Sequence, residues 1–185
     1  MRKIIASLFI SLDGVVESPD KWSLDYWTDE IGEVIGDAMA NSDAMLLGRK
    51  TYQGFAAVWP TVTIEQDPGA DYMNNTRKYV VSNTLTSADW HNSTLLSGDL
   101  ATEINKIKSE NGGDIMTSGS ATLVRSLLTH NVVDELNLLL YPVVVGRGQR
   151  LFDDNGAGRK MTLLRSNTFD NGVLNLVYTP AAGLG

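Results

Sequence analysis

The chain contains no cysteine and only two histidines among its 185 residues. Without cysteine it forms no disulfide, thiolate zinc site or iron–sulfur cluster, and it has no cysteine nucleophile. His91 and His130 belong to no H-E-x-x-H motif and to no Ser-His-Asp arrangement, and we expect no metal site. So few acid–base groups suit a reaction in which a bound cofactor carries the chemistry.

Positive charge is also scarce, since 15 Lys and Arg face 22 Asp and Glu and give a net charge of −7. This balance argues against a nucleic-acid-binding surface. The N-terminal apolar run is interrupted by Ser7 and Ser11 and ends at Asp13, which is not typical of a signal peptide, and no segment reaches transmembrane length. We therefore expect a cytoplasmic protein without a membrane or nucleic-acid partner, folded as a single domain over residues 1–185.

Apolar runs alternate with amphipathic stretches along most of the chain. Residues 4–12 are almost continuously apolar, which is typical of a strand covered on both faces of a parallel sheet. Asn171-Gly172 between two β-rich runs predicts a hairpin near the C-terminus. The sequence thus predicts an α/β fold, in which a mostly parallel sheet carries helices on both faces and ends in an antiparallel C-terminal hairpin. Residues 60–75 are expected to form a long loop, and residues 153–156 a turn.

Residues 112–128 predict a short strand, a small-residue turn and a helix that begins at Ala121. The first turn of this helix contains no acidic residue, so its backbone amides and positive dipole end are left free for an anion. Turns of this kind hold the pyrophosphate of a nucleotide in open α/β folds. The alternative is an ordinary turn in which Ser120 is the N-cap.

A second strand–glycine–helix junction follows the apolar run 44–47. Gly48 is the turn, and Arg49 and Lys50 begin the helix, where two cations oppose the helix dipole. A bound phosphate would turn this unfavourable placement into a favourable one. The alternative is a solvated basic turn. The order G-R-K-T is not a P-loop, because the earlier glycine of that motif is missing.

Polar residues also follow two expected strands, at the edge where parallel sheets bind ligands. Asp13 follows the first strand and is a candidate catalytic carboxylate, while Ser82 is a candidate partner of Arg49 on a ribose-phosphate. Either residue is alternatively a turn cap. Aromatic residues that are candidate walls for a planar ring, or alternatively core residues, are Trp22, Trp27, Tyr52 and Trp59.

Five motifs in order carry a family resemblance: S-L-D-G (11–14), L-L-G-R-K-T-Y (46–52), V-V-S-N (80–83), G-S-A-T-L-V (119–124), and V-D-E-L with P-V-V-V-G-R-G and L-F (133–152). Together they resemble the dihydrofolate reductase-like superfamily. More specifically, they are similar to small bacterial proteins like the reductase domain of the bifunctional deaminase-reductase of riboflavin biosynthesis. The resemblance implies a three-layer α/β/α fold that binds NADPH. The zinc deaminase domain that accompanies that reductase has no counterpart in this cysteine-free chain.

The resemblance also implies roles for individual residues. Arg49 would lie near the 2′-phosphate of NADPH and Ser82 near the adenosine ribose-phosphate. Asp13, with Gly14 in the same turn, would face the substrate and orient the ring or assist proton transfer. The remaining implied cofactor contacts are Gly48, Thr51, Gly119, Ser120, Ala121, Thr122 and Leu123.

These observations lead to a functional hypothesis. We expect an NADPH-dependent reductase that transfers hydride from nicotinamide to a small planar heterocycle, either pterin- or dihydrofolate-like or ribosylaminopyrimidine-like. The alternative is a non-catalytic nucleotide-binding module of the same fold. The C-terminal strands and the resemblance also suggest a homodimer.

Overall fold

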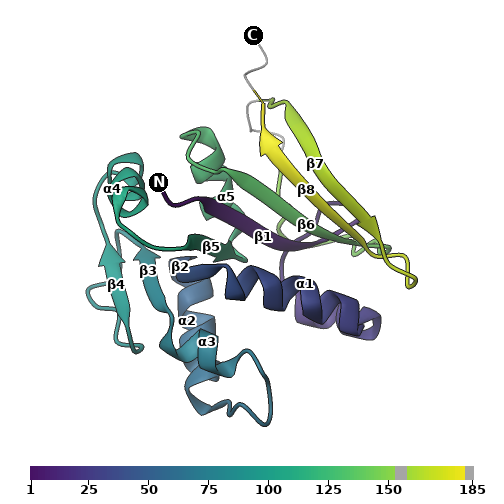
Figure 1. The fold of residues 1–185 in the computed structure, drawn as a ribbon, viewed down its shortest axis with the longest axis horizontal. Helices are drawn as coiled ribbons and strands as arrows, with labels where there is room; N and C mark the ends of the chain where they lie inside the picture. The colour runs from purple at the N-terminus through teal and green to yellow at the C-terminus, as the bar shows by residue number, and fades with distance from the viewer. Residues whose placement is uncertain (153–157, 182–185) are drawn as a thin grey trace.

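The computed structural model describes residues 1–152 and 158–181, in which one eight-stranded sheet runs through the molecule (Figure 1). The turn expected at residues 153–156 lies outside these ranges. The strands are β1 (Ile4–Ser11), β2 (Ser42–Gly48), β3 (Arg77–Val81), β4 (Ser93–Leu96), β5 (Asp114–Ser118), β6 (Glu135–Tyr141), β7 (Met161–Thr168) and β8 (Leu174–Pro180). The α-helices are α1 (Asp29–Ala40), α2 (Arg49–Val58), α3 (Ala70–Asn75), α4 (Leu100–Ser109) and α5 (Ala121–Thr129), and short 3-10 helices cover Pro19–Lys21, Leu24–Tyr26 and Trp59–Thr61.

The strands are arranged in the order β4-β3-β2-β5-β1-β6-β8-β7. The six strands from β4 to β6 are parallel, and β8 and β7 pair antiparallel at the end of the sheet. The mostly parallel sheet and its antiparallel C-terminal hairpin are therefore confirmed. Because β5 lies between β1 and β2, the carboxyl ends of these three strands meet at the centre of one edge.

Helices cover both faces of the sheet, as the alternation of side chains along β2 requires. Ala44 and Leu46 join a core cluster with residues of α4 and α5. Met45 and Leu47 point to the opposite face and pack with residues of α2 and α3. The two clusters make three layers, which confirms the predicted α/β/α architecture (Figure 1).

The stretch 60–75 is not the long loop that the sequence suggested. It ends in α3, a helix of six residues whose Ala70 and Met73 are buried three positions apart. Asp67 Oδ1 accepts the N–H of Gly69 at 2.8 Å and fixes the turn into the helix. A helix this short contains too few residues for its periodicity to be recognised in a sequence, and tertiary contacts stabilise it.

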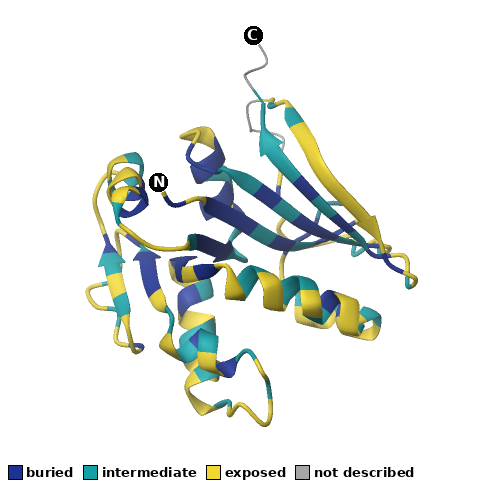
Figure 2. Ribbon diagram, viewed as in Figure 1, coloured by how far each residue is buried: buried dark blue, intermediate teal, exposed yellow. Residues whose placement is uncertain are grey.

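The antiparallel end of the sheet is far more exposed than its parallel centre (Figure 2). Seven of the eight residues of β7, from Thr162 to Thr168, are exposed, and they include Leu163 and Leu164. An uncovered edge strand of this kind is a surface on which another chain can pair. The homodimer stays a prediction. Among the described residues no helix is long and apolar enough to cross a membrane.

Candidate cofactor and substrate cavity

The β2–α2 and β5–α5 junctions touch each other at the carboxyl edge of the sheet. A Cβ atom on Gly48 would lie only 2.6 Å from Ser120 Oγ, so this close approach requires glycine. Gly119 has φ +72° and approaches the Thr51 side chain in the same way, at 3.2 Å from its would-be Cβ. The N-termini of two helices are thereby held side by side.

Both helix N-termini lack an acidic residue in the first turn. Gly48 caps α2 without a side chain, whereas Ser120 caps α5 and accepts the Leu123 N–H at 3.3 Å. Ser120 adopts φ +37°, a left-handed conformation that is strained for a residue with a Cβ. The two positive dipole ends therefore reinforce each other at one place, which favours an anion there.

Arg49 and Lys50 add two positive charges to the start of α2. Both side chains are exposed; Arg49 Nη1 donates to Gln53 Oε1 at 3.1 Å, and within the described ranges Lys50 has no hydrogen-bond or ion-pair partner. Neither cation is neutralised by a carboxylate in that part of the chain. Two such cations at a helix N-terminus are unfavourable unless an anion joins them.

A cavity of about 760 Å³ opens at these junctions. One end, which we call the junction end, is formed by Gly48, Arg49, Lys50, Thr51 and residues 118–123. The structure thus brings together the predicted cofactor residues Gly48, Arg49, Thr51, Gly119, Ser120, Ala121, Thr122 and Leu123.

A second part of the lining, which we call the ring end, is mostly apolar. It is lined by Leu8, Phe9, Val16, Pro19 and Phe55, together with Glu17, Ser18 and Gln149. It exists because β5 ends at Ser118, opposite Ser7, while β1 continues to Ser11 and leaves its flank unpaired there. An apolar slot with a few polar groups is the usual form of a small-molecule site.

Asp13 does not line this cavity. Its Oδ1 accepts the Ser11 hydroxyl at 2.6 Å and the Val145 N–H at 3.0 Å, and its Oδ2 accepts the Gly146 N–H at 2.8 Å. The Ser11 hydroxyl and these backbone amides lower the pKa of Asp13 to about 2. A carboxylate so engaged and ionised is a poor proton donor. In this geometry Asp13 anchors the segment after β6, and its catalytic use stays a prediction.

Gly14 and Ser82 are likewise engaged in turns outside the cavity. Gly14 has φ +82°, and its carbonyl oxygen accepts the Leu151 N–H at 2.9 Å. Ser82 is buried, and its hydroxyl oxygen accepts the N–H groups of Thr84 and Leu85 at 3.1 and 3.0 Å. The turn-capping alternative therefore describes Ser82 better than the ribose-phosphate role, and only its neighbour Val81 lines the cavity.

The four candidate aromatic walls also lie elsewhere. Trp22 packs edge-on against Tyr141 at 5.6 Å between ring centroids, and Trp27 is 55% exposed on the surface beside α1. Trp59 packs in the core cluster on the α2 face of the sheet. Tyr52 is buried there as well, so none of these four aromatic residues lines the cavity.

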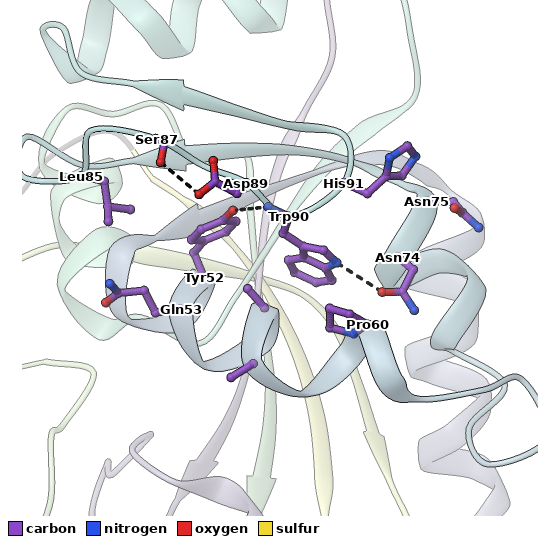
Figure 3. Close-up of a pocket in the computed structure, with 12 residues that line it drawn as sticks. Tyr52, Gln53, Pro60, Asn74, Asn75, Leu85, Ser87, Asp89, Trp90 and His91 are labelled. Carbon is purple, nitrogen blue, oxygen red and sulfur yellow. Dashed lines mark hydrogen bonds between the residues drawn. The ribbon is translucent and has the colours of Figure 1, made fainter.

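Tyr52 belongs to a different, open hollow on the other side of α2 (Figure 3). Its hydroxyl oxygen accepts the Trp90 N–H at 2.8 Å, and the Trp90 indole N–H donates to Asn74 Oδ1 at 3.2 Å. Helical spacing explains why α2 lines both the cavity and this hollow. Thr51 and Phe55 lie on one face of the helix, whereas Tyr52 and Ala56 lie on another.

A buried cation supports this second hollow. Lys78 is fully buried, and its Nζ donates to the carbonyls of Asn74, Thr76 and His91 at 3.0, 2.8 and 3.1 Å. The ammonium also lies 4.2 Å from the centroid of the Trp90 ring. Burial lowers the pKa of Lys78 to about 8. All three donor positions are used, so Lys78 joins segments of the fold and is not available to a ligand.

Sequence reasoning missed the residues that form the ring end. Phe55 follows Thr51 by one helical turn, and that spacing was the available signal. Phe9 lies on β1 beyond the register position where β5 stops, which only the sheet order reveals. Glu17 and Gln149 come from two loops that the fold brings together, since Glu17 Oε2 accepts the Gln149 N–H at 2.8 Å.

A family model described as the RibD C-terminal domain matches residues 2–175. The chain belongs to the RibD C-terminal domain family. This family comprises NADPH-dependent pyrimidine reductases, and the resemblance stated from the motifs is confirmed. Among curated relatives of this RibD-type chain, uncharacterized protein YyaP of Bacillus subtilis (strain 168) is 29% identical, over 96% of this chain and 94% of that protein.

Solved structures show the same fold as this RibD-type domain. A Shewanella sp. PV-4 protein named for riboflavin biosynthesis has a TM-score of 0.74 at 16% identity, with 98% of this chain and all of that chain covered. The Thermotoga maritima diaminohydroxyphosphoribosylaminopyrimidine deaminase/5-amino-6-(5-phosphoribosylamino)uracil reductase gives 0.67 at 14%, covering 97% of this chain and 57% of that chain. Dihydrofolate reductase from Enterococcus faecalis gives 0.64 at 11%, with 97% of both chains covered, so the fold is dihydrofolate reductase-like.

Proposed function

We propose that the protein is an NADPH-dependent reductase that transfers hydride to a small planar heterocycle. The observation that supports this most strongly is the junction end of the cavity, where two helix N-termini meet beside two cations without a carboxylate partner in the described ranges. This arrangement suits a dinucleotide with a phosphate on its ribose. The adjoining apolar ring end suits a flat ring.

The residues present fit the cofactor. Gly48 lets Ser120 approach the start of α2 closely, and the amides at the starts of α2 and α5 suit a pyrophosphate. Arg49, with Lys50 beside it, would hold the 2′-phosphate as charge-assisted partners. NADPH, when bound, supplies the hydride. The protein orients the cofactor and excludes water, and Phe9 and Phe55 provide apolar surface for the rings.

The substrate we propose is pterin- or dihydrofolate-like or ribosylaminopyrimidine-like. The Thermotoga neighbour is named as a reductase of 5-amino-6-(5-phosphoribosylamino)uracil, which makes an aminopyrimidine the first compound class to test. The alternative is a nucleotide-binding module without turnover. One observation favours it: among the described residues that line the cavity, Glu17 is the only carboxylate and there is no histidine.

The test is NADPH oxidation followed by the loss of absorbance at 340 nm, with aminopyrimidine and dihydropterin substrates offered in turn. The reductase predicts oxidation that depends on both components. Saturable NADPH binding without turnover of any of these compounds would favour the module. Absence of NADPH binding would contradict both.

A further inference from the structure

Two Asn-Gly pairs in the described ranges are held by the fold in very different ways. Asn111-Gly112 follows α4, and Asn171-Gly172 lies in the turn between β7 and β8. An asparagine that precedes glycine is especially prone to lose ammonia. The reason is that glycine has no side chain to hinder attack of its backbone nitrogen on the asparagine side chain. The contacts around each pair therefore decide which asparagine reacts.

The hairpin pair is held at every group that the reaction uses. Asn171 Oδ1 accepts the Val173 N–H at 3.0 Å, and Asn171 Nδ2 donates to the Tyr26 carbonyl oxygen at 2.5 Å. The Gly172 N–H donates to the Phe169 carbonyl oxygen at 2.9 Å. These hydrogen bonds must break before the Gly172 nitrogen can reach Asn171 Cγ, so the turn protects this pair.

The pair after α4 has none of these contacts. Asn111 is exposed, and within residues 1–152 and 158–181 neither its side-chain amide nor the Gly112 N–H has a hydrogen-bond partner. A Cβ atom on Gly112 would lie only 2.5 Å from Asp43 Oδ2, so the fold requires glycine at this position. The residue that makes asparagine reactive is therefore fixed here by packing, while both reacting groups stay free.

We propose that Asn111 is a site of spontaneous covalent modification, at which loss of ammonia gives a succinimide and then aspartate or isoaspartate. The Gly112 nitrogen forms a bond to Asn111 Cγ, the bond from Cγ to Nδ2 breaks, and the proton of the Gly112 N–H leaves with the ammonia. Water then opens the ring. Attack of water at Cγ gives aspartate, and attack at the backbone carbonyl carbon gives isoaspartate. The reaction needs no cofactor and is independent of the proposed function.

The modification falls beside contacts that anchor the start of β5. The Gly113 N–H donates to Asp43 Oδ2 at 2.9 Å, and the Gly113 carbonyl oxygen accepts from Arg2 Nε at 2.7 Å. Isoaspartate inserts an extra carbon into the backbone just before these contacts, so it should lower the free energy of unfolding. The β5–α5 junction lies at the other end of β5, after Ser118, and NADPH affinity should not change.

The test follows ammonia loss by mass spectrometry at mildly alkaline pH, which favours the deprotonated backbone nitrogen. Trypsin places Asn111 in peptide 109–125 and Asn171 in peptide 166–185, and fragmentation assigns the modified residue within each. A third pair, Asn155-Gly156, lies outside the described ranges and falls in the separate peptide 151–159.

In the folded protein we expect Asn111 to be modified about tenfold faster than Asn171. In protein unfolded by guanidinium chloride the two rates should agree within about threefold, since both residues precede glycine. Equal rates in the folded protein, or a faster reaction at Asn171, would overturn the proposal. A tenfold difference that persisted in the unfolded protein would overturn it too, because the fold would then not be its cause.

A variant pair connects the chemistry to stability. Asn111→Gln removes the reactive side chain, because a glutamine must close a larger and slower-forming ring. Asn83→Gln is the matched control, since Asn83 is also exposed but precedes Thr84. After ageing, wild type and Asn83→Gln should gain isoaspartate at position 111 and unfold at lower urea concentration than fresh protein, whereas Asn111→Gln should not. An equal loss of stability in aged Asn111→Gln would contradict the role of this site.

Discussion

The two ends of the cavity differ in the groups that line them, which are mainly backbone at one end and side chains at the other. The junction end is made of backbone: two helix N-termini, a glycine that lets them touch, and a cap on α5. The ring end is made of side chains from β1, the loop after it and α2. Backbone amides bind any anion of suitable shape, whereas side chains determine which ring fits. Under the proposed function, the junction end binds the cofactor and the ring end selects the substrate.

The largest effect on ligand affinity is expected from Gly48→Ala, which alters the junction end. The new methyl would meet Ser120 Oγ at 2.6 Å and force the two helix N-termini apart. We expect at least a tenfold rise in the NADPH dissociation constant, or ~1.4 kcal/mol, measured by calorimetry. Gly36→Ala, in α1 with open space around its Cβ position, is the matched control. Unaltered NADPH affinity in Gly48→Ala would mean that the contact between the junctions does not form the site.

Phe55→Ala alters the ring end. It tests whether the two ends of the cavity bind different ligands. We expect the dissociation constant of 7,8-dihydropterin to rise about tenfold, since truncation removes apolar contact of the order of 25 cal/mol per Å². NADPH affinity should change less than threefold. Val58→Ala, a truncation of an exposed residue on the same helix, controls for effects on α2. A larger loss for NADPH than for the pterin would reverse the assignment of the two ends.

Ser120 tests the α5 half of the junction end. Ser120→Ala removes the cap on the Leu123 N–H and keeps a Cβ at φ +37°, so the free energy of unfolding should fall by about 1 kcal/mol. Ser120→Gly also loses the cap but relieves the left-handed strain, and it should cost only a few tenths of a kcal/mol. Urea unfolding of both variants measures the difference. Equal losses would show that backbone strain at this position contributes nothing.

The smallest effect on turnover at neutral pH is expected from Asp13→Asn. The folded protein lowers the pKa of Asp13 to about 2 from an ordinary value of 3.8, so the ionised carboxylate stabilises the fold above about pH 4. That stabilisation is lost as the pH falls from about 4 to about 2. The difference in unfolding free energy between wild type and Asp13→Asn should therefore shrink across that window, as urea titrations at several pH values would show. If the variant instead abolished turnover at pH 7 while remaining folded, Asp13 would regain a catalytic role.

This difference between backbone and side-chain lining also explains which features of the site could be predicted from the sequence. The junction end depends on local order, since a strand, a glycine and a helix follow one another in the chain. G-R-K-T and S-G-S-A-T therefore each predicted a helix that begins after a glycine turn, and the fold brings these two helix N-termini together. Helix caps are equally local, and Ser120 acts as the N-cap that its position suggested.

The ring end depends on which strands are neighbours. Phe9 lines it because β5 stops beside Ser7, and no local pattern in β1 records where β5 stops. Trp22 and Tyr52 were predicted to line the pocket, but Trp22 packs against Tyr141 and Tyr52 lies on the face of α2 that joins a core cluster. Asp13 and Ser82 stand where ligand-binding residues are expected, yet nearby backbone amides engage them first. Sequence position indicated the correct edge of the sheet without showing which side chains were free.

The most direct test of the central claim compares NADPH with NADH by isothermal titration calorimetry. Wild-type protein and the double variant Arg49→Ala, Lys50→Ala are each titrated with both cofactors. A charge-assisted contact to the 2′-phosphate predicts that wild type binds NADPH at least tenfold more tightly than NADH, and that the double variant binds the two alike. Equal affinity of wild type for both cofactors, or a preference that survives in the double variant, would contradict the assignment of this end of the cavity to NADPH.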